Sequence, residues 1–148
     1  MFLVDTNVLL RSVKPEHPMY TDAVSTTSAL LERGEELYVV PQNLIEFWRT
    51  CTRPVDRNGF GMTASQAEAE LTHIESIFPI FPDVPAIYSE WRRLVVAYEV
   101  LGIQVHDARL VAAMRVHGIS HILTFNTQDF RRYADIIVVH PVECGDNI

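Results

Sequence analysis

Positive charge is scarce in this sequence, and almost none of it comes from lysine. The 148 residues carry 12 Lys and Arg against 19 Asp and Glu, a formal net charge of −7, and Lys14 is the single lysine. Proteins that bind polyanions usually carry a basic patch, so the overall charge gives no sign of a nucleic-acid partner. The remaining cations are arginines, whose planar guanidinium groups match phosphate geometry, but a general compositional bias explains their number equally well.

Cysteine and long apolar runs are also scarce. Cys51 and Cys144 form neither a CxxC pattern nor a Cys/His spacing, which argues against a zinc site and a disulfide framework and favours a reducing compartment. No apolar run approaches the roughly 18 residues of a membrane span, and the N-terminus lacks the basic and small-residue pattern of a signal peptide. We therefore expect a cytoplasmic protein with no membrane association.

The sequence does have enough apolar content for one core. A hydrophobic fraction of 48% over 148 residues, without repeats or low-complexity tracts, predicts a single domain spanning residues 1–148. The segment 54–61 is rich in turn formers, but neither flank is able to fold alone. We therefore interpret it as an exposed loop and not as a domain linker.

Short apolar, β-branched runs alternate with helical patterns. The runs typical of buried strands are residues 2–5, 37–40, 121–124 and 136–139. A capping box at residues 63–66 predicts one helix, Pro85 to Gly102 a second, and His106 to His117, ended by Gly118, a third. The inward face of the second helix is expected to carry Tyr88, Trp91, Leu94 and Val95. This alternation predicts an α/β fold with a mainly parallel sheet.

Acidic side chains follow the carboxyl ends of the predicted strands. Asp5 ends the first strand, and Glu46 lies about one turn into the helix after the second. Asp107 lies in the first turn of its helix, on the apolar stripe, and Asp129 follows the third strand. Ligands of open parallel sheets bind beyond the carboxyl ends of the strands, so we expect these acids to converge on one rim.

Each acid taken alone has an ordinary structural explanation. Asp5 and Asp129 are suited to capping a helix or a turn, Asp107 to the helix dipole, and Glu46 to a solvated helix face. Together they would be costly, because two carboxylates about 5 Å apart repel by roughly 3 kcal/mol at an effective dielectric near 20. A divalent cation removes that strain, and oxygen ligands without clustered Cys or His favour Mg²⁺ or Mn²⁺.

Four segments, in this order, resemble the PIN-domain ribonucleases, in particular the VapC-like toxins of type II toxin–antitoxin systems. They are MFLVDTN, VVPQNLIEFWR with Glu46, HDARLVAAM with Asp107, and LTFNTQDF. The loop TRPVDRNGFG and the helix after it are also similar, so the resemblance covers nearly the whole chain. It implies a three-layer α/β/α sandwich around a mainly parallel sheet and an endoribonuclease that depends on Mg²⁺ or Mn²⁺.

The resemblance also implies roles for individual residues. Asp5, Glu46 and Asp107 match the three core acids of the family, as catalytic residues and metal ligands. Asp5 and Asp107 would hold the ion, and Glu46 would be a further ligand or would orient and deprotonate the attacking water. Where many members have a fourth acid this chain has Asn126, so Asp129 is the candidate fourth ligand, acting through water. We expect one well-held ion and a second recruited with substrate, and products with a 5′-phosphate and a 3′-hydroxyl.

Six further residues are candidates to support the acids. Thr6, Asn7, Thr124 and Asn126 would orient carboxylates or contact a phosphate oxygen, and Arg49 and Arg109 would contact the RNA backbone. Helix-start residues and ordinary surface arginines are the alternative explanations. The six histidines are scattered without an acid–base spacing, which argues against a histidine-based ribonuclease.

The expected partners follow from the same resemblance. They are an RNA substrate, a cognate antitoxin whose helix fills the groove beside the acids, and a second copy of the chain in a homodimer. Two other classes stay open: a PIN-like protein that binds RNA or antitoxin without cutting, and a different Mg²⁺-dependent phosphohydrolase such as a phosphatase. Asn7 stands where a phosphoaspartate enzyme would need its second acid, and a DNA-directed nuclease is a further alternative.

Overall fold

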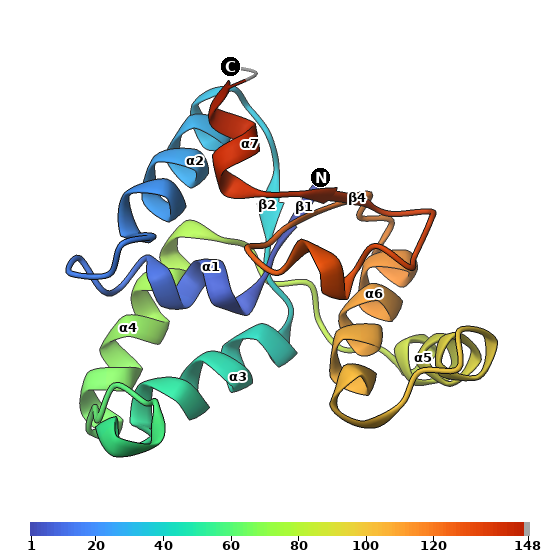
Figure 1. The fold of residues 1–148 in the computed structure, drawn as a ribbon, viewed down its shortest axis with the longest axis horizontal. Helices are drawn as coiled ribbons and strands as arrows, with labels where there is room; N and C mark the ends of the chain where they lie inside the picture. Colours follow the sequence, from blue (N-terminus) through green and yellow to red (C-terminus); the bar gives the residue numbers. More distant parts are fainter. Residues whose placement is uncertain (147–148) are drawn as a thin grey trace.

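A four-stranded parallel sheet lies at the centre of the protein (Figure 1). The structure is a computed structural model that describes residues 1–146, with the side chains of residues 1–143. The strands lie in the order β2-β1-β3-β4, and all three pairings are parallel. They are β1 (Phe2–Val4), β2 (Leu37–Tyr38), β3 (His121–Leu123) and β4 (Ile137–Val139). All four predicted strands are confirmed, with bounds that agree within two residues.

Helices cover both faces of this sheet. They are α1 (Thr6–Arg11), α2 (Tyr20–Glu32), α3 (Pro41–Thr52), α4 (Ala64–Ile77), α5 (Pro85–Ala97), α6 (Val105–His117) and α7 (Pro141–Asp146). Three short 3₁₀ turns, η1 (Val55–Arg57), η2 (Gly102–Gln104) and η3 (Thr127–Asp129), lie in the connections. Figure 1 shows α5 and α6 on one side of the sheet and α1 to α4 on the other. The three-layer α/β/α sandwich is therefore confirmed.

The strands are apolar throughout because both of their faces are buried. Leu3 and Ile122 point to the layer of α5 and α6, where Leu94 and Met114 join them in one core. Phe2, Val4 and Leu123 point to the opposite layer, with residues of α1 to α4. This two-sided burial explains why the strands read as continuous apolar runs and not as alternating ones.

The sequence signals at the helix ends were mostly reliable. Thr63 and Gln66 form the predicted capping box, with the Gln66 N–H to Thr63 Oγ1 distance at 3.1 Å and the reciprocal bond at 2.9 Å. Gly118 ends α6 at φ 71°, in the left-handed region that favours glycine. Within segment 54–61, η1 forms a single turn and its residues are exposed, as expected for a loop.

The prediction for α5 was wrong in two respects. Tyr88 does not face inward, since it is 63% exposed; the buried stripe runs through Ile87 and Leu94. The helix ends at Ala97 and not at Gly102, because Glu99 turns left-handed at φ 50° and the Val100 N–H bonds back to the Val95 carbonyl at 3.0 Å. This is a Schellman-type ending built on a non-glycine residue, so the sequence carried no glycine signal for it.

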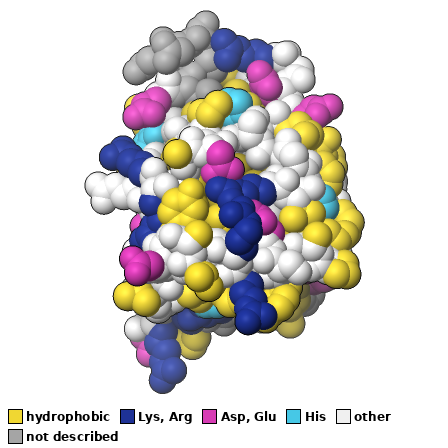
Figure 2. All heavy atoms as spheres, turned by 90° about the vertical axis from the view of Figure 1, so that its right-hand side faces the viewer, with side chains coloured by type: hydrophobic (Ala, Val, Ile, Leu, Met, Phe, Trp, Pro, Cys, Tyr) yellow, Lys and Arg dark blue, Asp and Glu magenta, His cyan; other side chains and the backbone are white. Residues whose placement is uncertain are grey.

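The outer surface on the α5 side mixes apolar and charged side chains. Figure 2 shows basic side chains gathered near the middle of this face, with acidic and hydrophobic side chains around them. Tyr88 and Val96 of α5 are among the exposed hydrophobic residues. Over the residues that the structure describes, no helix has both the length and the apolar character needed to cross a membrane.

Candidate active site

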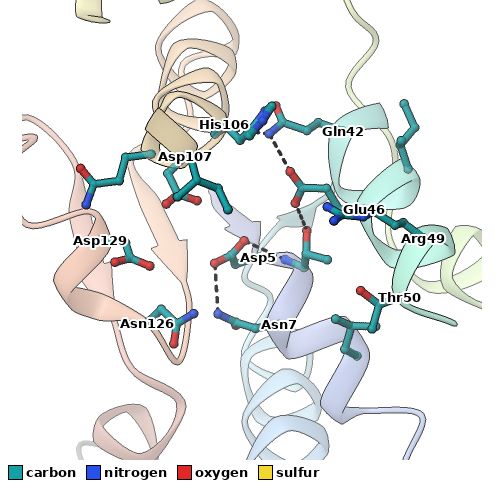
Figure 3. Close-up of a pocket in the computed structure, with 15 residues that line it drawn as sticks. Asp5, Asn7, Gln42, Glu46, Arg49, Thr50, His106, Asp107, Asn126 and Asp129 are labelled. Carbon is teal, nitrogen blue, oxygen red and sulfur yellow. Dashed lines mark hydrogen bonds between the residues drawn. The ribbon is translucent and has the colours of Figure 1, made fainter. Parts of the chain in front are cut away.

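The carboxyl ends of the central strands open onto one cavity of about 630 Å³ (Figure 3). Strand β1 lies between β2 and β3, so the connections leave in opposite directions at its end, which is the switch point where parallel sheets bind ligands. The cavity is lined by all four predicted acids: Asp5, Glu46, Asp107 and Asp129. Figure 3 places Asp5 between Glu46 on one side and Asp107 and Asp129 on the other.

Asp5 is held at the end of β1 by hydrogen bonds to both carboxylate oxygens. The Thr6 backbone N–H donates to Oδ1 at 2.8 Å, so Asp5 is the N-cap of α1. The Thr124 hydroxyl donates to Oδ2 at 2.7 Å, and the Asn7 amide donates to the same oxygen at 3.3 Å. Because each carboxylate oxygen has more than one acceptor site, capping α1 leaves Asp5 able to bind a ligand in the cavity.

Asn7 and Thr124 join the start of α1 to the end of β3. The Asn7 amide donates to Thr124 Oγ1 at 3.1 Å, and Asn7 Oδ1 accepts from the Phe125 N–H at 3.2 Å. Thr124 Oγ1 also accepts from the Asn126 N–H at 3.0 Å. Thr124 is fully buried and does not line the cavity, so what it does in this structure is fix the rotamer of Asp5.

Glu46 is half-buried on α3, and its two oxygens also have separate donors. The Thr6 hydroxyl donates to Oε2 at 2.9 Å, and the Gln42 amide donates to Oε1 at 2.9 Å. The buried Asn43 amide supports Thr6 by donating to its hydroxyl at 3.3 Å. Thr6 therefore links the two acids, with its N–H on Asp5 and its hydroxyl on Glu46.

Asp107 and Asp129 differ from these two acids. Their carboxylates accept no hydrogen bond from the side chains and backbone described for residues 1–143. Asp107 is half-buried in the first turn of α6, and Asp129 is exposed in η3. Both therefore present oxygens to the cavity without an internal donor.

The pKa values of the two buried acids reflect burial and repulsion. Burial raises the pKa of Asp5 to about 6, against the hydrogen bonds from Thr124 and Thr6, and the charges of Glu46 and Asp129 raise it further. Burial likewise raises the pKa of Asp107 to about 7, with added repulsion from the other three acids. The Arg132 charge lowers the pKa of Asp107, but as the smallest of these contributions. The cavity thus concentrates negative charge that the chain itself does not neutralise.

This donor set fits a hard divalent cation bound partly through water. Among the described residues, no three His, Cys, Asp or Glu side chains lie close enough together to hold one ion directly. The sequence expectation of three acids on a shared ion is therefore not met by direct contact in this structure. Mg²⁺ needs only one or two protein carboxylates and keeps several waters, and the Asp107 oxygens, together with the remaining acceptor positions of the hydrogen-bonded Asp5 oxygens, are suited to that mode.

The other predicted residues are divided between the cavity and its surroundings. Asn7, Asn126 and the exposed Arg49 line the cavity, as does Thr6. Arg109 does not line it: its guanidinium donates to Gln42 Oε1 at 3.1 Å and lies 3.2 Å from Asp83 Oδ1. Arg49 is therefore placed to meet a ligand, whereas Arg109 contacts the residues behind the cavity wall.

The sequence analysis missed Gln42 and Asn43. Both are buried polar residues on α3, and both donate to the network around Glu46, Gln42 directly and Asn43 through Thr6. The signal for Gln42 was its position one helical turn before Glu46, where i and i+4 side chains meet. Asn43 was harder to find because its role depends on α1 lying beside α3.

The family comparison matches nearly the whole chain. The family model of the PIN domain matches residues 2–136. No curated protein matches the chain.

Three solved structures illustrate the similarity in fold. VapBC2 from Rickettsia felis, bound to a DNA fragment from its promoter, has a TM-score of 0.70 at 14% identity, over 94% of this chain and 97% of that one. VapBC-1 from nontypeable Haemophilus influenzae has a TM-score of 0.71 at 11% identity, over 95% and 98%. Mycobacterium tuberculosis VapC20, described as a sarcin–ricin loop cleaving toxin, has a TM-score of 0.60 at 16% identity, over 82% and 87%. At these identities the likeness establishes a shared fold.

Proposed function

Because the chain belongs to the PIN domain family, we propose that it is a metal-dependent endoribonuclease and the toxin of a toxin–antitoxin pair. The observation that carries the proposal is the gathering of four acids around one cavity, two of them with a raised pKa, and none of the four in an ion pair with a described residue. A structural role does not require such a cluster, because an isolated carboxylate is buried at a cost of several kcal/mol unless something compensates it.

Bound Mg²⁺ or Mn²⁺ would supply the positive charge that steadies a phosphate in the transition state and lowers the pKa of water. Asp5 and Asp107 are the residues proposed to hold it directly, with Asp129 acting through water. Thr6, Asn7 and Thr124 keep the Asp5 carboxylate in one orientation, so little has to reorganise when the ion binds.

Glu46 is proposed to orient the attacking water and accept its proton. Its carboxylate is fixed by Thr6 and Gln42 and points into the cavity from the side opposite Asp107 (Figure 3). Attack by water on phosphorus breaks the bond to the 3′-oxygen and leaves a 5′-phosphate and a 3′-hydroxyl. Arg49 and Asn126 line the same cavity and would contact the phosphate oxygens of the RNA.

The proposed partners are an antitoxin, a second copy of the chain and an RNA, in the cytoplasm. A structural neighbour from Klebsiella pneumoniae, described as a toxin–antitoxin complex, supports the antitoxin, and the neighbour described as a sarcin–ricin loop cleaving toxin supports an RNA substrate. The homodimer rests on the family resemblance of the sequence. The cavity beside Glu46 and Asp107 is the proposed site of antitoxin inhibition.

The decisive experiment is cleavage of total RNA by purified, antitoxin-free protein with Mg²⁺, with Mn²⁺ and with EDTA. Asp5→Asn and Asp107→Asn are the test variants, and Asp56→Asn, an exposed acid in η1, is the matched control. We expect metal-dependent cutting that both test variants lose and the control keeps.

Other outcomes separate the alternatives. Equal cutting by wild type and Asp107→Asn would reject the site. Binding of RNA or metal without cutting would instead favour the inactive PIN-like protein, for which the replacement of an acid by Asn126 is the specific observation. Parallel assays with a DNA oligonucleotide and a small phosphate monoester distinguish a DNA nuclease and a phosphatase.

A further inference from the structure

Gln42 lies at the crossing of α3 and the first turn of α6, and all the hydrogen-bonding groups of its amide are used. Its nitrogen donates to Glu46 Oε1 at 2.9 Å and to the His106 carbonyl at 2.8 Å. Its oxygen accepts from the Arg109 guanidinium at 3.1 Å. The residue is only 7% exposed, and Figure 3 shows it between Glu46 and His106.

The orientation of this amide is set by its partners. A guanidinium is only a donor, so it must face the amide oxygen, and a backbone carbonyl is only an acceptor, so it must face the amide nitrogen. The second N–H of that nitrogen then points at Glu46. The His106 carbonyl and the Arg109 guanidinium, both on α6, therefore orient the Gln42 amide so that its N–H donates to Glu46.

Arg109 is itself braced from the other side. Its second guanidinium nitrogen lies 3.2 Å from Asp83 Oδ1, in the connection before α5. The chain of contacts therefore runs from Asp83 through Arg109 and Gln42 to Glu46. It also holds the backbone beside Asp107, because His106 is the residue before it.

We propose that Gln42, held by Arg109, is a positioning residue that sets the carboxylate of Glu46 relative to Asp107 across the cavity. The inference rests on the proposed function, since it assigns Gln42 a role in the same reaction. Arg109 acts through Gln42 and not through a phosphate of the RNA. Glu46 has three rotatable side-chain bonds, and the Thr6 hydroxyl alone would fix only one of its oxygens.

The test uses four single variants of the full chain and the double variant Gln42→Met/Arg109→Met. Gln42→Met keeps the volume and removes all three hydrogen bonds, whereas Gln42→Glu keeps an acceptor for Arg109 and places a second carboxylate against Glu46. Arg109→Met removes the outer brace at a partly exposed position, so it keeps the test open if Gln42→Met fails to fold. Thr26→Val is the matched control, because it removes a buried hydroxyl that donates to the Pro141 carbonyl at 2.7 Å, away from the acids.

Three readouts are measured for each variant: melting temperature, Mn²⁺ affinity by isothermal titration calorimetry, and kcat and KM for a defined RNA. We expect Gln42→Met to lower kcat by about 30-fold with KM changed less than 2-fold, and Gln42→Glu to lower it further. Arg109→Met should lower kcat by about 5-fold, and it should have no added effect in the presence of Gln42→Met. Mn²⁺ affinity should fall by about 3-fold in Gln42→Met and in Arg109→Met, while Thr26→Val changes only the melting temperature.

Several results would overturn the inference. An unchanged kcat in Gln42→Met would show that Gln42 does not position Glu46. Additive losses of kcat in the double variant would show that Arg109 does not act through Gln42. A higher KM in Arg109→Met with a weaker salt dependence would assign Arg109 to a phosphate contact. If wild type cuts RNA and the Gln42 variants do so equally, the positioning role fails alone. If wild type does not cut RNA and Mn²⁺ affinity still falls in the variants, the proposed function fails. The role of Gln42 in positioning Glu46 would then still be supported.

Discussion

The two ends of helix α6 differ in whether their charged side chains have partners of opposite charge. At the first turn, Asp107 faces three other acids around the cavity, and burial and repulsion raise its pKa to about 7. At the last turn, Arg115 lies between Glu90, at 3.1 Å, and Asp135, so each charge has an opposite partner. Hydrogen bonds from Arg93 and Arg115 lower the pKa of Glu90.

The difference separates charges that stabilise the fold from charges that are left to bind a ligand. The Arg115 cluster ties α6 to α5 and to the segment before β4, and its charges balance within the chain. The cavity at the other end is left unbalanced, although the positive end of the α6 dipole lies at Asp107. An unneutralised cluster is costly in the free protein and favourable only when a cation completes it.

The largest expected effect concerns activity. Asp107→Asn should reduce RNA cleavage by about 10³-fold, because the substitution removes a charge needed in the transition state. Glu90→Gln, at the balanced end of α6, should change the rate less than 2-fold. Initial rates of RNA cleavage at saturating Mg²⁺ measure both effects. Equal losses of rate in the two variants would mean that the difference between the ends of α6 is unrelated to activity.

The next largest effect concerns stability. Arg115→Met should lower the free energy of unfolding by about 2 kcal/mol, because it leaves Glu90 and Asp135 facing each other without the cation between them. The value is below that of a fully buried pair because Arg115 and its partners are partly exposed. Urea unfolding measures it, and a stability within 0.5 kcal/mol of wild type, roughly the size of a surface substitution, would contradict it.

Metal should stabilise the folded protein in a pH-dependent way. A carboxyl whose pKa is raised in the folded state favours folding while it is protonated, and this contribution is lost as the pH rises from about 4 through the raised values near 6 and 7. The metal-free protein should therefore lose stability between pH 5 and 8. Mn²⁺ at about ten times its Kd should restore about 1.4 kcal/mol at pH 8 and much less at pH 5. Equal increases in melting temperature with Mn²⁺ at pH 5 and pH 8 would contradict this prediction.

A smaller effect of opposite sign is expected for the metal-free Asp107→Asn variant. At pH 8 it should be more stable than wild type by about 1 kcal/mol, after allowance for solvent screening of a half-exposed group. At pH 5 the gain should vanish, because wild-type Asp107 is then protonated. Denaturant unfolding in EDTA checks both values. A destabilised variant at pH 8 would show that the Asp107 charge has a structural partner.

The smallest effect belongs to the exposed part of the balanced cluster. Arg93 pairs with Glu90 on the outer face of α5, and its side chain is 59% exposed. Arg93→Ala should leave the urea unfolding curve close to that of wild type, because solvent-exposed ion pairs contribute little to stability. A loss as large as that of Arg115→Met would show that burial does not distinguish the two arginines.

The sheet and the convergence of the acids were predictable because they follow from strand ends. A parallel sheet brings the carboxyl end of every strand to one edge, so Asp5 and Asp129 were placed by topology alone. Glu46 and Asp107 followed because each lies within the first turns of a helix at that edge.

What was missed depends on how helices pack against one another. The role of Gln42 exists only because α6 passes α3 at His106, which no local pattern records. On α5, Leu94 is buried and Trp91 and Val95 pack against the core as predicted, with the Trp91 indole donating to the Val105 carbonyl at 2.8 Å, and only Tyr88 was misjudged. Propensity fixes where a helix lies in the chain, but tertiary contacts fix its rotation.

The pairing of β1 with β3 has a consequence for the protein during its synthesis. Asp5 is synthesised 119 residues before Thr124, yet the strand beside it and the hydroxyl that fixes its rotamer belong to residues 121–124. A nascent chain therefore carries its first acid long before it has the neighbours that shape the cavity. The cavity is therefore completed only when β3 pairs with β1, after the helices that come between these strands in the chain have been made.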